Sequence, residues 1–239
     1  MRAQALKEKG ARRTEEALAR AAVYRLLSRG LAPAPGREAG PADADHAAAL
    51  AGALAALAWA GLSLKTPRRP SRAAPAPGPA AAAACPPYET EYTGVHVFMR
   101  VQQLADVAGF YRAFGVRLAN GFRERPDHVA AELEFMYLLT FKEARALSRG
   151  EEENAGICRR AQARFLEEHL GRWLAPFAGR LRQTGHGAGR SRLARLARDF
   201  VAEDARRLGV HPQAARTRAR PEPAPELQCP AGGEGSAGR

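Results

Sequence analysis

The sequence contains little cysteine and few aromatic residues. Its three cysteines in 239 residues, Cys85, Cys158 and Cys229, are too far apart to form a CxxC metal or redox pair. An odd and sparse set of this kind is typical of proteins from a reducing compartment. Aromatic residues make up 7% of the chain, and Val, Ile and Thr are also infrequent. This composition argues against an all-β protein and against a disulfide-rich scaffold.

Long runs of large apolar residues are also missing. The N-terminal segment has no apolar core region, so we expect no secretory signal. The uncharged run over residues 47–64 consists mostly of alanine, and its residues Leu50, Leu54 and Leu57 fall on one helical stripe. We therefore expect a buried core helix rather than a membrane span, in a cytoplasmic protein.

The formal net charge of +12 is concentrated outside the middle of the chain. Residues 88–180 carry 13 basic and 13 acidic side chains. Residues 1–87 carry 13 basic against 6 acidic, and residues 181–220 carry 10 against 3. A small basic helical nucleic-acid-binding protein is therefore an alternative. Because the middle segment is neutral and holds the motifs described below, we expect no nucleic-acid partner.

Apolar periodicity predicts helices and no strand of any length. The first helix is expected to begin after Thr14 as the N-cap and to end at Gly30. Its expected inward face is formed by Leu18, Ala22 and Leu26. The full set of expected helices covers residues 14–29, 47–64, 102–116, 127–150, 151–174 and 191–208.

Three segments lack the helical pattern. Residues 88–98 are expected to be extended or irregular. The low-complexity Pro/Ala insertion over residues 66–87 is expected to be flexible, and residues 213–239 are expected to form a disordered tail. The predicted fold is thus all-α, with a single helical bundle domain over residues 1–212.

The most distinctive motif is Glu-Arg-Pro-Asp-His at residues 124–128. Pro126 disfavours helix for the residue before it, so Asp127 is the expected N-cap of the long helix that follows. His128 and Glu132 lie at i and i+4, which suits a local hydrogen bond, a binding surface, or a metal or acid–base pair. No third ligand completes a zinc site nearby. We expect no bound metal, and a metal-dependent hydrolase is the weaker alternative.

A second cluster of polar residues follows the insertion. Tyr88, Glu89, Glu91 and Tyr92 form an acidic–aromatic cluster, which is either an ordinary solvated surface or a rim whose carboxylates contact the arginines of a peptide. His169 beside Trp173 is interpreted as a core histidine. The chain contains no GxGxxG, Walker, GxSxG or HExxH motif, so no enzyme and no cofactor are predicted.

Several stretches resemble the TorD/DmsD/NarJ family of redox enzyme maturation chaperones. They are ADVAGFYRAFGVR, ERPDHVAAELEFMYLLTFKEARAL and RRAQARFLEEHLGRWLAPFAGRL, with ALARAAVYRLLSRGL near the start. The stretch YETEYTGVHVFMRVQQLADVAGFYRAFGV is most similar to the chaperones that accompany dimethyl sulfide dehydrogenase, ethylbenzene dehydrogenase, and chlorate or selenate reductase.

This resemblance implies a TorD-like, all-helical cytoplasmic chaperone without catalytic activity. Its partners would be the apo catalytic subunit of a molybdenum oxidoreductase and the twin-arginine leader peptide of that subunit. The chaperone would hold the subunit until the molybdopterin guanine dinucleotide cofactor is inserted. The expected client-binding residues are Tyr88, Glu89, Glu91, Tyr111, Phe114, Glu124, Pro126, Asp127, His128 and Glu132.

Overall fold

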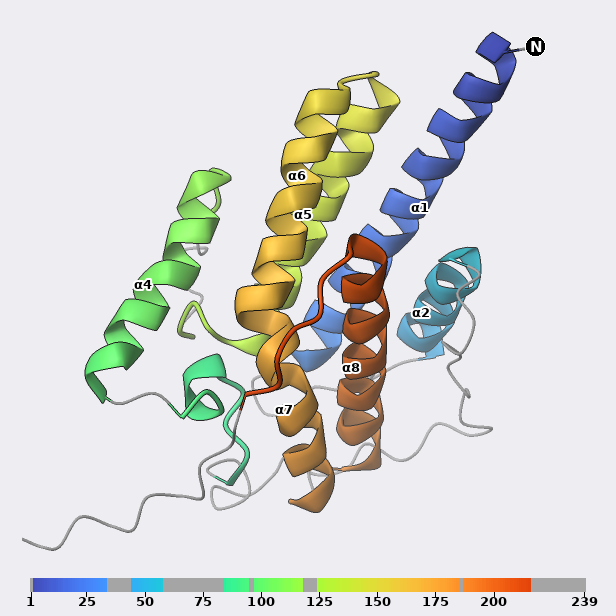
Figure 1. The fold of residues 1–239 in the computed structure, drawn as a ribbon. Helices are drawn as coiled ribbons and strands as arrows, with labels where there is room; N and C mark the ends of the chain where they lie inside the picture. Colours follow the sequence, from blue (N-terminus) through green and yellow to red (C-terminus); the bar gives the residue numbers. More distant parts are fainter. Residues whose placement is uncertain are drawn as a thin grey trace, which may run out of the picture.

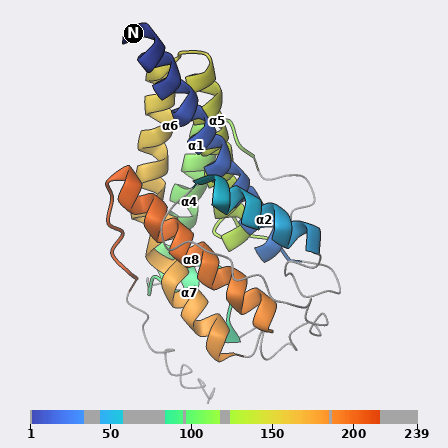
Figure 2. The ribbon, with the colours of Figure 1, turned by 90° about the vertical axis from the view of Figure 1, so that its right-hand side faces the viewer.

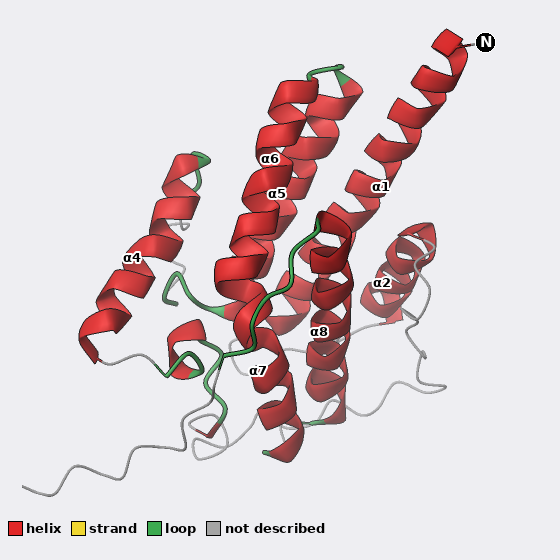
Figure 3. Ribbon diagram, in the orientation of Figure 1, coloured by secondary structure: helices red, strands yellow, loops and turns green. Residues whose placement is uncertain are grey.

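The computed structural model describes residues 2–33, 44–57, 84–94, 97–117, 124–184 and 187–215. These residues form helices and turns, with no strand among them (Figure 3). The prediction of an all-α fold is therefore confirmed. The helical elements are α1 (Arg2–Leu31), α2 (Ala44–Leu57), η1 (Glu89–Glu91), α4 (Val97–Ala113), α5 (Val129–Ser148), α6 (Glu152–Phe165), η2 (Leu166–Leu170), α7 (Gly171–Gln183) and α8 (Ala188–Leu208).

The bundle is built around helix α5. Helix α1 packs along α5 and is covered by α2, while α5 and α6 form a hairpin (Figures 1 and 2). The chain continues from α6 through η2 into α7, and α8 packs against α7. Helix α4 stands at the side of the bundle, next to η1 and the beginning of α5 (Figure 1). This arrangement brings the residues after the insertion close to the start of α5.

Helix α1 is longer than predicted at both ends. Thr14 is not an N-cap, because its Oγ1 donates to the carbonyl oxygen of Gly10 at 3.1 Å inside the helix. Gly30 does not end the helix either. A side chain at Gly30 would collide with Leu193 of α8, so this glycine allows close packing of two helices.

The inward face of α1 also differs from the prediction. Leu18 is 45% exposed, whereas the charged Arg20 is only 3% exposed. Arg20 donates to both carboxylate oxygens of Asp204 at 2.7 and 2.9 Å and to Glu143 at 3.0 Å. Apolar periodicity places an arginine outside, and this one is inside because two buried carboxylates neutralise it. The buried residues of α1 include Ala17, Arg20, Ala21, Val23, Tyr24, Leu27 and Leu31.

The predicted helix over residues 151–174 is divided and extended in the structure. It is interrupted by the π-helical turn η2 and continues as α7, which contains Pro176. A proline has no backbone N–H, so it leaves the carbonyl of the residue four positions earlier without a helical donor. That carbonyl belongs to Arg172, and it accepts a hydrogen bond from Ala215 N at 2.8 Å.

The segment after α8 therefore packs on the bundle, where it crosses the start of α7 (Figure 1). Pro212 lies so close to Gly171 that a side chain at position 171 would collide with it. The expectation of disorder from residue 213 onwards is thus wrong for residues 213–215. The rest of the expected tail lies outside the described residues.

The last residues of the predicted flexible insertion, and the segment after it, are also folded. Residues 66–83 lie outside the described residues, but Cys85 is buried, with its Sγ 3.5 Å from the Tyr92 hydroxyl. Residues 88–98 are not extended throughout, because η1 is a 3₁₀ turn and α4 already begins at Val97. This turn is closed by the Tyr92 N–H, which donates to the Glu89 carbonyl at 2.9 Å.

Other predicted features are confirmed. Leu50, Leu54 and Leu57 form a buried stripe on α2, although residues 58–64 of the predicted helix lie outside the described residues. Gly150, with φ of +72°, follows the end of α5 as expected. Among the helices that the structure describes, none has the length and apolar character needed to span a membrane.

Candidate functional site

Two segments distant in sequence meet at a corner beside the start of α5. Tyr88 and His128 form an isolated antiparallel bridge. Next to this bridge, the Glu89 N–H donates to the Asp127 carbonyl at 3.0 Å. Backbone pairing therefore joins the acidic–aromatic cluster to the 124–128 motif, as a single site.

Asp127 lies at the centre of this corner and is fully buried. Its Oδ2 accepts hydrogen bonds from the backbone N–H of Thr90 at 3.1 Å and from the Thr90 hydroxyl at 2.9 Å. Arg125 donates to both Asp127 oxygens, at 2.9 and 3.0 Å. The prediction that Asp127 caps α5 is wrong, because its carboxylate turns towards the other loop.

The N-cap of α5 is His128. Its Nδ1 accepts a hydrogen bond from the Ala130 N–H at 3.0 Å. Burial lowers the pKa of His128 to about 4, so the ring is neutral near pH 7 and Nδ1 can act as an acceptor. A histidine thus performs the function that sequence preferences assign to aspartate.

The Arg125 guanidinium occupies a well-defined site at the surface of the corner. Besides its two bonds to Asp127, it donates to the Thr90 hydroxyl at 2.9 Å. Its central carbon lies 4.1 Å from the centre of the Tyr88 ring, a cation–π contact, and Glu91 Oε1 lies 3.4 Å from its Nη1. The corner therefore binds a guanidinium group through carboxylates, a hydroxyl and an aromatic face.

Four of the predicted site residues remain partly accessible around this guanidinium. Tyr88, Glu91, Glu124 and Pro126 are all half-buried. The Tyr88 hydroxyl donates to Glu124. Burial, followed by the hydrogen bond to Glu124, raises the pKa of Tyr88 to about 12. These residues form the part of the corner that a partner molecule can reach directly.

The remaining acidic residues of the predicted site are inside the protein. Glu89 and Glu132 are fully buried. Glu132 Oε2 accepts from Trp173 Nε1 at 3.0 Å, while the Glu89 carboxylate lies 3.2 Å from Nδ1 of His169. Burial, and secondarily the charge of Glu89, raises the pKa of Glu132 well above its ordinary value. Burial therefore favours the neutral form of Glu132.

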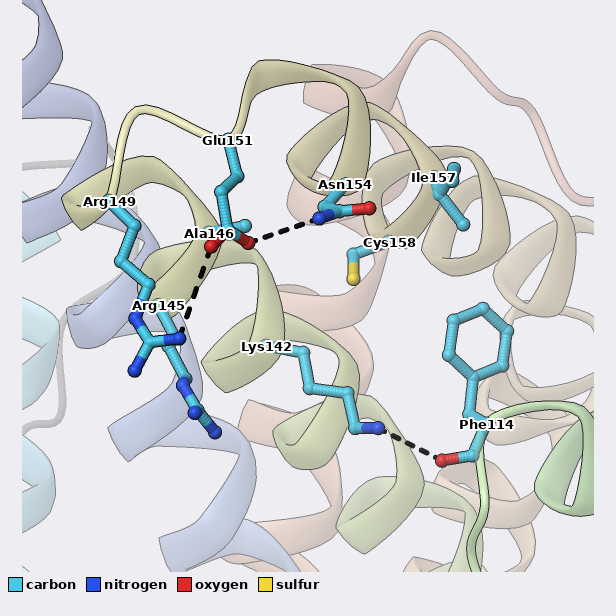
Figure 4. A pocket seen from close by; sticks show the side chains of 9 residues that line it. All are labelled: Phe114, Lys142, Arg145, Ala146, Arg149, Glu151, Asn154, Ile157 and Cys158. Atoms are coloured by element: carbon cyan, nitrogen blue, oxygen red, sulfur yellow. Dashed lines mark hydrogen bonds and ion pairs between the residues drawn. The ribbon is translucent and has the colours of Figure 1, made fainter.

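The two aromatic residues expected from α4 have different surroundings. Tyr111 is buried, and its hydroxyl donates to the Pro126 carbonyl at 2.7 Å, so it supports the corner. Phe114 is half-buried and lines a separate hollow of about 330 Å³ near the α5–α6 connection (Figure 4). Lys142 and Arg145 also line this hollow, and Lys142 Nζ donates to the Phe114 carbonyl at 3.0 Å. Phe114 is therefore associated with a basic hollow as well as with the core.

Sequence reasoning missed three contributors to this site. Thr90 carries no periodic signal, and its role depends on a loop that meets Asp127 only in the folded chain. Arg125 stands in the motif but was expected only as the residue before a proline. His169 was correctly interpreted as a core histidine, since it is 2% exposed. Its contact with Glu89 was not predicted, because the two residues are 80 positions apart in the sequence.

Comparisons with known proteins give this corner a context. Residues 78–179 match the family model of the nitrate reductase delta subunit. The perchlorate reductase assembly chaperone protein of Dechloromonas aromatica is 44% identical over 85 residues, which are 35% of this chain and 37% of that protein.

Two further relatives extend the match. The selenate reductase assembly chaperone protein of Thauera selenatis is 35% identical over 111 residues, or 44% of this chain and 56% of that protein. The chaperone protein TorD of Vibrio cholerae serotype O1 is 31% identical over 120 residues, which are 49% of this chain and 52% of that protein. The aligned part of this chain thus spans about half or less of the length of these relatives.

The resemblance to the TorD/DmsD/NarJ family is confirmed by these matches. The match to the nitrate reductase delta subunit family model covers residues 78–179, which are less than half of the chain. The chain is a homologue of proteins named as assembly chaperones of perchlorate and selenate reductases. The matched segment contains the corner, α4, α5, α6 and most of α7.

Proposed function

We propose that this protein is a cytoplasmic assembly chaperone for the catalytic subunit of a molybdenum oxidoreductase. It binds the apo subunit and its twin-arginine leader peptide, and releases them after the molybdopterin guanine dinucleotide cofactor has been inserted. It carries out no catalysis itself. The homology to named assembly chaperones supports this class of function.

The observation that carries the proposal is the guanidinium site at the corner. Planar guanidinium groups are recognised by paired carboxylates and aromatic faces, and this chain places both around Arg125. The leader's arginines approach the half-buried Glu91 and Glu124, and one of them exchanges with Arg125, which is itself 34% exposed. The buried Asp127 acts as the fixed acceptor beneath them.

The peptide part of the proposal is tested by calorimetric titration. The probe is the twin-arginine leader of a molybdenum oxidoreductase catalytic subunit from the same genome, and the matched probe has both arginines replaced by lysine. We expect Glu91→Gln and Glu124→Gln each to weaken binding of the arginine peptide about three- to tenfold, since half-exposed charge pairs contribute about 1 kcal/mol. Glu153→Gln, on the exposed first turn of α6, is the control and leaves affinity unchanged.

A second experiment tests the guanidinium site without a peptide. Arg125→Ala vacates the space between Asp127 and the Tyr88 ring, and we expect methylguanidinium to raise the melting temperature of this variant but not of the wild type. Methylammonium at equal concentration is the control. No stabilisation by methylguanidinium, together with equal binding of the arginine and lysine peptides, would show that the corner does not recognise arginine.

The chaperone function itself is tested in cells. The full chain is co-expressed with the apo catalytic subunit, and the cofactor content of the purified subunit is measured with and without it. We expect the two proteins to co-purify, and the cofactor-loaded fraction to fall when the chain is absent. Equal loading in both cases would contradict the proposed function.

A further inference from the structure

A second candidate site lies on the other side of His169 from the corner. There, a cavity of about 880 Å³ opens between α4, the π turn η2 and the segment after α8. It is lined by Asp106 of α4, by the consecutive residues Glu167, Glu168 and His169 of η2, and by His211. In a regular α-helix successive side chains are about 100° apart, whereas the wider π turn brings three of them to one cavity.

His169 is the unusual member of this set. It is only 2% exposed, and its Nδ1 lies 3.2 and 3.3 Å from the two oxygens of Glu89. Its Nε2 makes no hydrogen bond with any described residue, and Oδ2 of Asp106 lies 3.4 Å from it. With Nδ1–H donated to Glu89, the Nε2 lone pair is directed towards the cavity. This carboxylate–histidine arrangement is the usual support of a metal-binding imidazole.

Two carboxylates accompany this nitrogen. One ligand atom each from Asp106, Glu168 and His169 lies within 4.8 Å of the others. In a zinc site the metal–ligand distances are about 2.0–2.2 Å, which places the ligands about 3.4 Å apart. Asp106 is 57% exposed and Glu168 39% exposed at their side chains, so small rotamer changes bring their oxygens to that spacing.

Arg164 is the competing partner of Glu168. Its Nε donates to the two Glu168 oxygens at 2.9 and 3.1 Å, and the Arg164 side chain in this ion pair is 66% exposed. Exposed pairs of this kind are weak, and the long arginine side chain is able to move into solvent. A divalent cation that displaces Arg164 brings two positive charges, instead of one, next to the carboxylates of Asp106 and Glu168.

We propose that Asp106, Glu168 and His169 bind a first-row divalent cation, of which Zn²⁺ is the representative, with Glu89 orienting the imidazole. One imidazole and two carboxylates favour such an ion over Mg²⁺ or Ca²⁺, which prefer oxygen ligands alone. The remaining coordination positions face the cavity and are open to water or to a ligand. The ion connects α4 to η2 and so fixes α4 on the bundle. This site is independent of the proposed function.

The expectation that no metal is bound was based on His128 and Glu132, which is a different pair. Here the ligands come from positions 106 and 168–169, which meet only in the folded chain. The test uses the full chain, purified without an affinity tag and treated with chelator. Zn²⁺ is titrated into it by calorimetry, and thermal melts are recorded with and without the ion.

We expect one equivalent of Zn²⁺ to bind and to raise the melting temperature. Asp106→Asn and Glu168→Gln each reduce the affinity at least tenfold, and Glu89→Gln reduces it about ten- to a hundredfold through the imidazole. Arg164→Ala increases the affinity, because it removes the competing cation. Glu167→Gln is the matched control, since this residue lines the same cavity outside the ligand set, and it leaves the affinity unchanged.

Two results would overturn the proposal. One is the absence of Zn²⁺ binding to the wild type at an ion concentration of about 100 µM. The other is binding that Asp106→Asn and Glu168→Gln leave unchanged, which would assign the ion to other residues. Because Asp106 and Glu168 are accessible, these variants are expected to fold even if a change at the buried His169 does not. Co²⁺ provides a second readout, since its visible absorption reports the ligand set.

Discussion

The backbone N–H of Ala215 donates to the carbonyl oxygen of Arg172, which Pro176 has deprived of a helical donor. A short segment after the last helix thus completes the hydrogen bonding of an interior helix. An unpaired backbone carbonyl in a buried position costs about 1–3 kcal/mol, so this contact is relevant to stability.

A pair of truncations tests this contact. We expect a chain ending after Ala215 to unfold with the same free energy as the full chain. A chain ending after Pro212 should lose about 1–2 kcal/mol, because the Arg172 carbonyl then has water as its only partner. Urea unfolding followed by circular dichroism measures both. Equal stability of the two truncated chains would show that the contact contributes nothing.

The buried Arg20 gives a larger expected effect. Arg20→Ala leaves Asp204 inside the bundle without its cation, whereas Glu143 keeps its ion pair with Arg159, and the loss of a buried charge partner costs about 3–5 kcal/mol. Arg13 lies on the same helix as Arg20 and forms an exposed ion pair with Glu152 of α6; Arg13→Ala is therefore the matched control and should cost at most about 1 kcal/mol. Similar losses for the two variants in urea unfolding would contradict the assigned role of Arg20.

His128 should make the folded state sensitive to acid. Burial lowers its pKa to about 4, against 6.5 for an unperturbed histidine, so between these values the unfolded chain binds a proton that the folded chain does not. Stability present above pH 6.5 is therefore lost as the pH falls towards about 4. Asn also caps helices, so His128→Asn should reduce this slope while keeping the cap. Unfolding free energies between about pH 7 and 4.5 provide the comparison, and parallel curves would rule out His128 as the source.

Glu132 should act in the opposite direction. Its pKa is raised well above 4.5 by burial and by the charge of Glu89. Above pH 4.5 the unfolded chain releases a proton that the folded chain keeps, so stability falls as the pH rises. Glu132→Gln stays neutral and can still accept from Trp173. Its stability relative to the wild type should rise as the pH increases above 4.5, by at most about 1.4 kcal/mol per pH unit. A difference that does not change with pH would contradict this.

Much of the helical framework was accessible from the sequence, because helix signals are local. The apolar stripe of α5, the glycine after it and the stripe of Leu50, Leu54 and Leu57 depend on residues within a few turns of one another. The motif at residues 124–128 was also found in this way, since proline and the residues around it have strong local preferences. The site that this motif helps to build was only half visible, because its other half comes from residues 88–91.

The sequence by itself determined the all-α class, the helix-rich neutral middle and the motif at residues 124–128 that forms half of the corner. Only the tertiary structure decided which acidic residues are buried. Glu91 remains accessible while Glu89, two positions away, is enclosed with His169, and Arg20 lies inside because Asp204 is there to receive it. The physical reason is that burying a charge is costly unless a partner compensates it. Those partners come from elements far away in sequence, so no local pattern can reveal them.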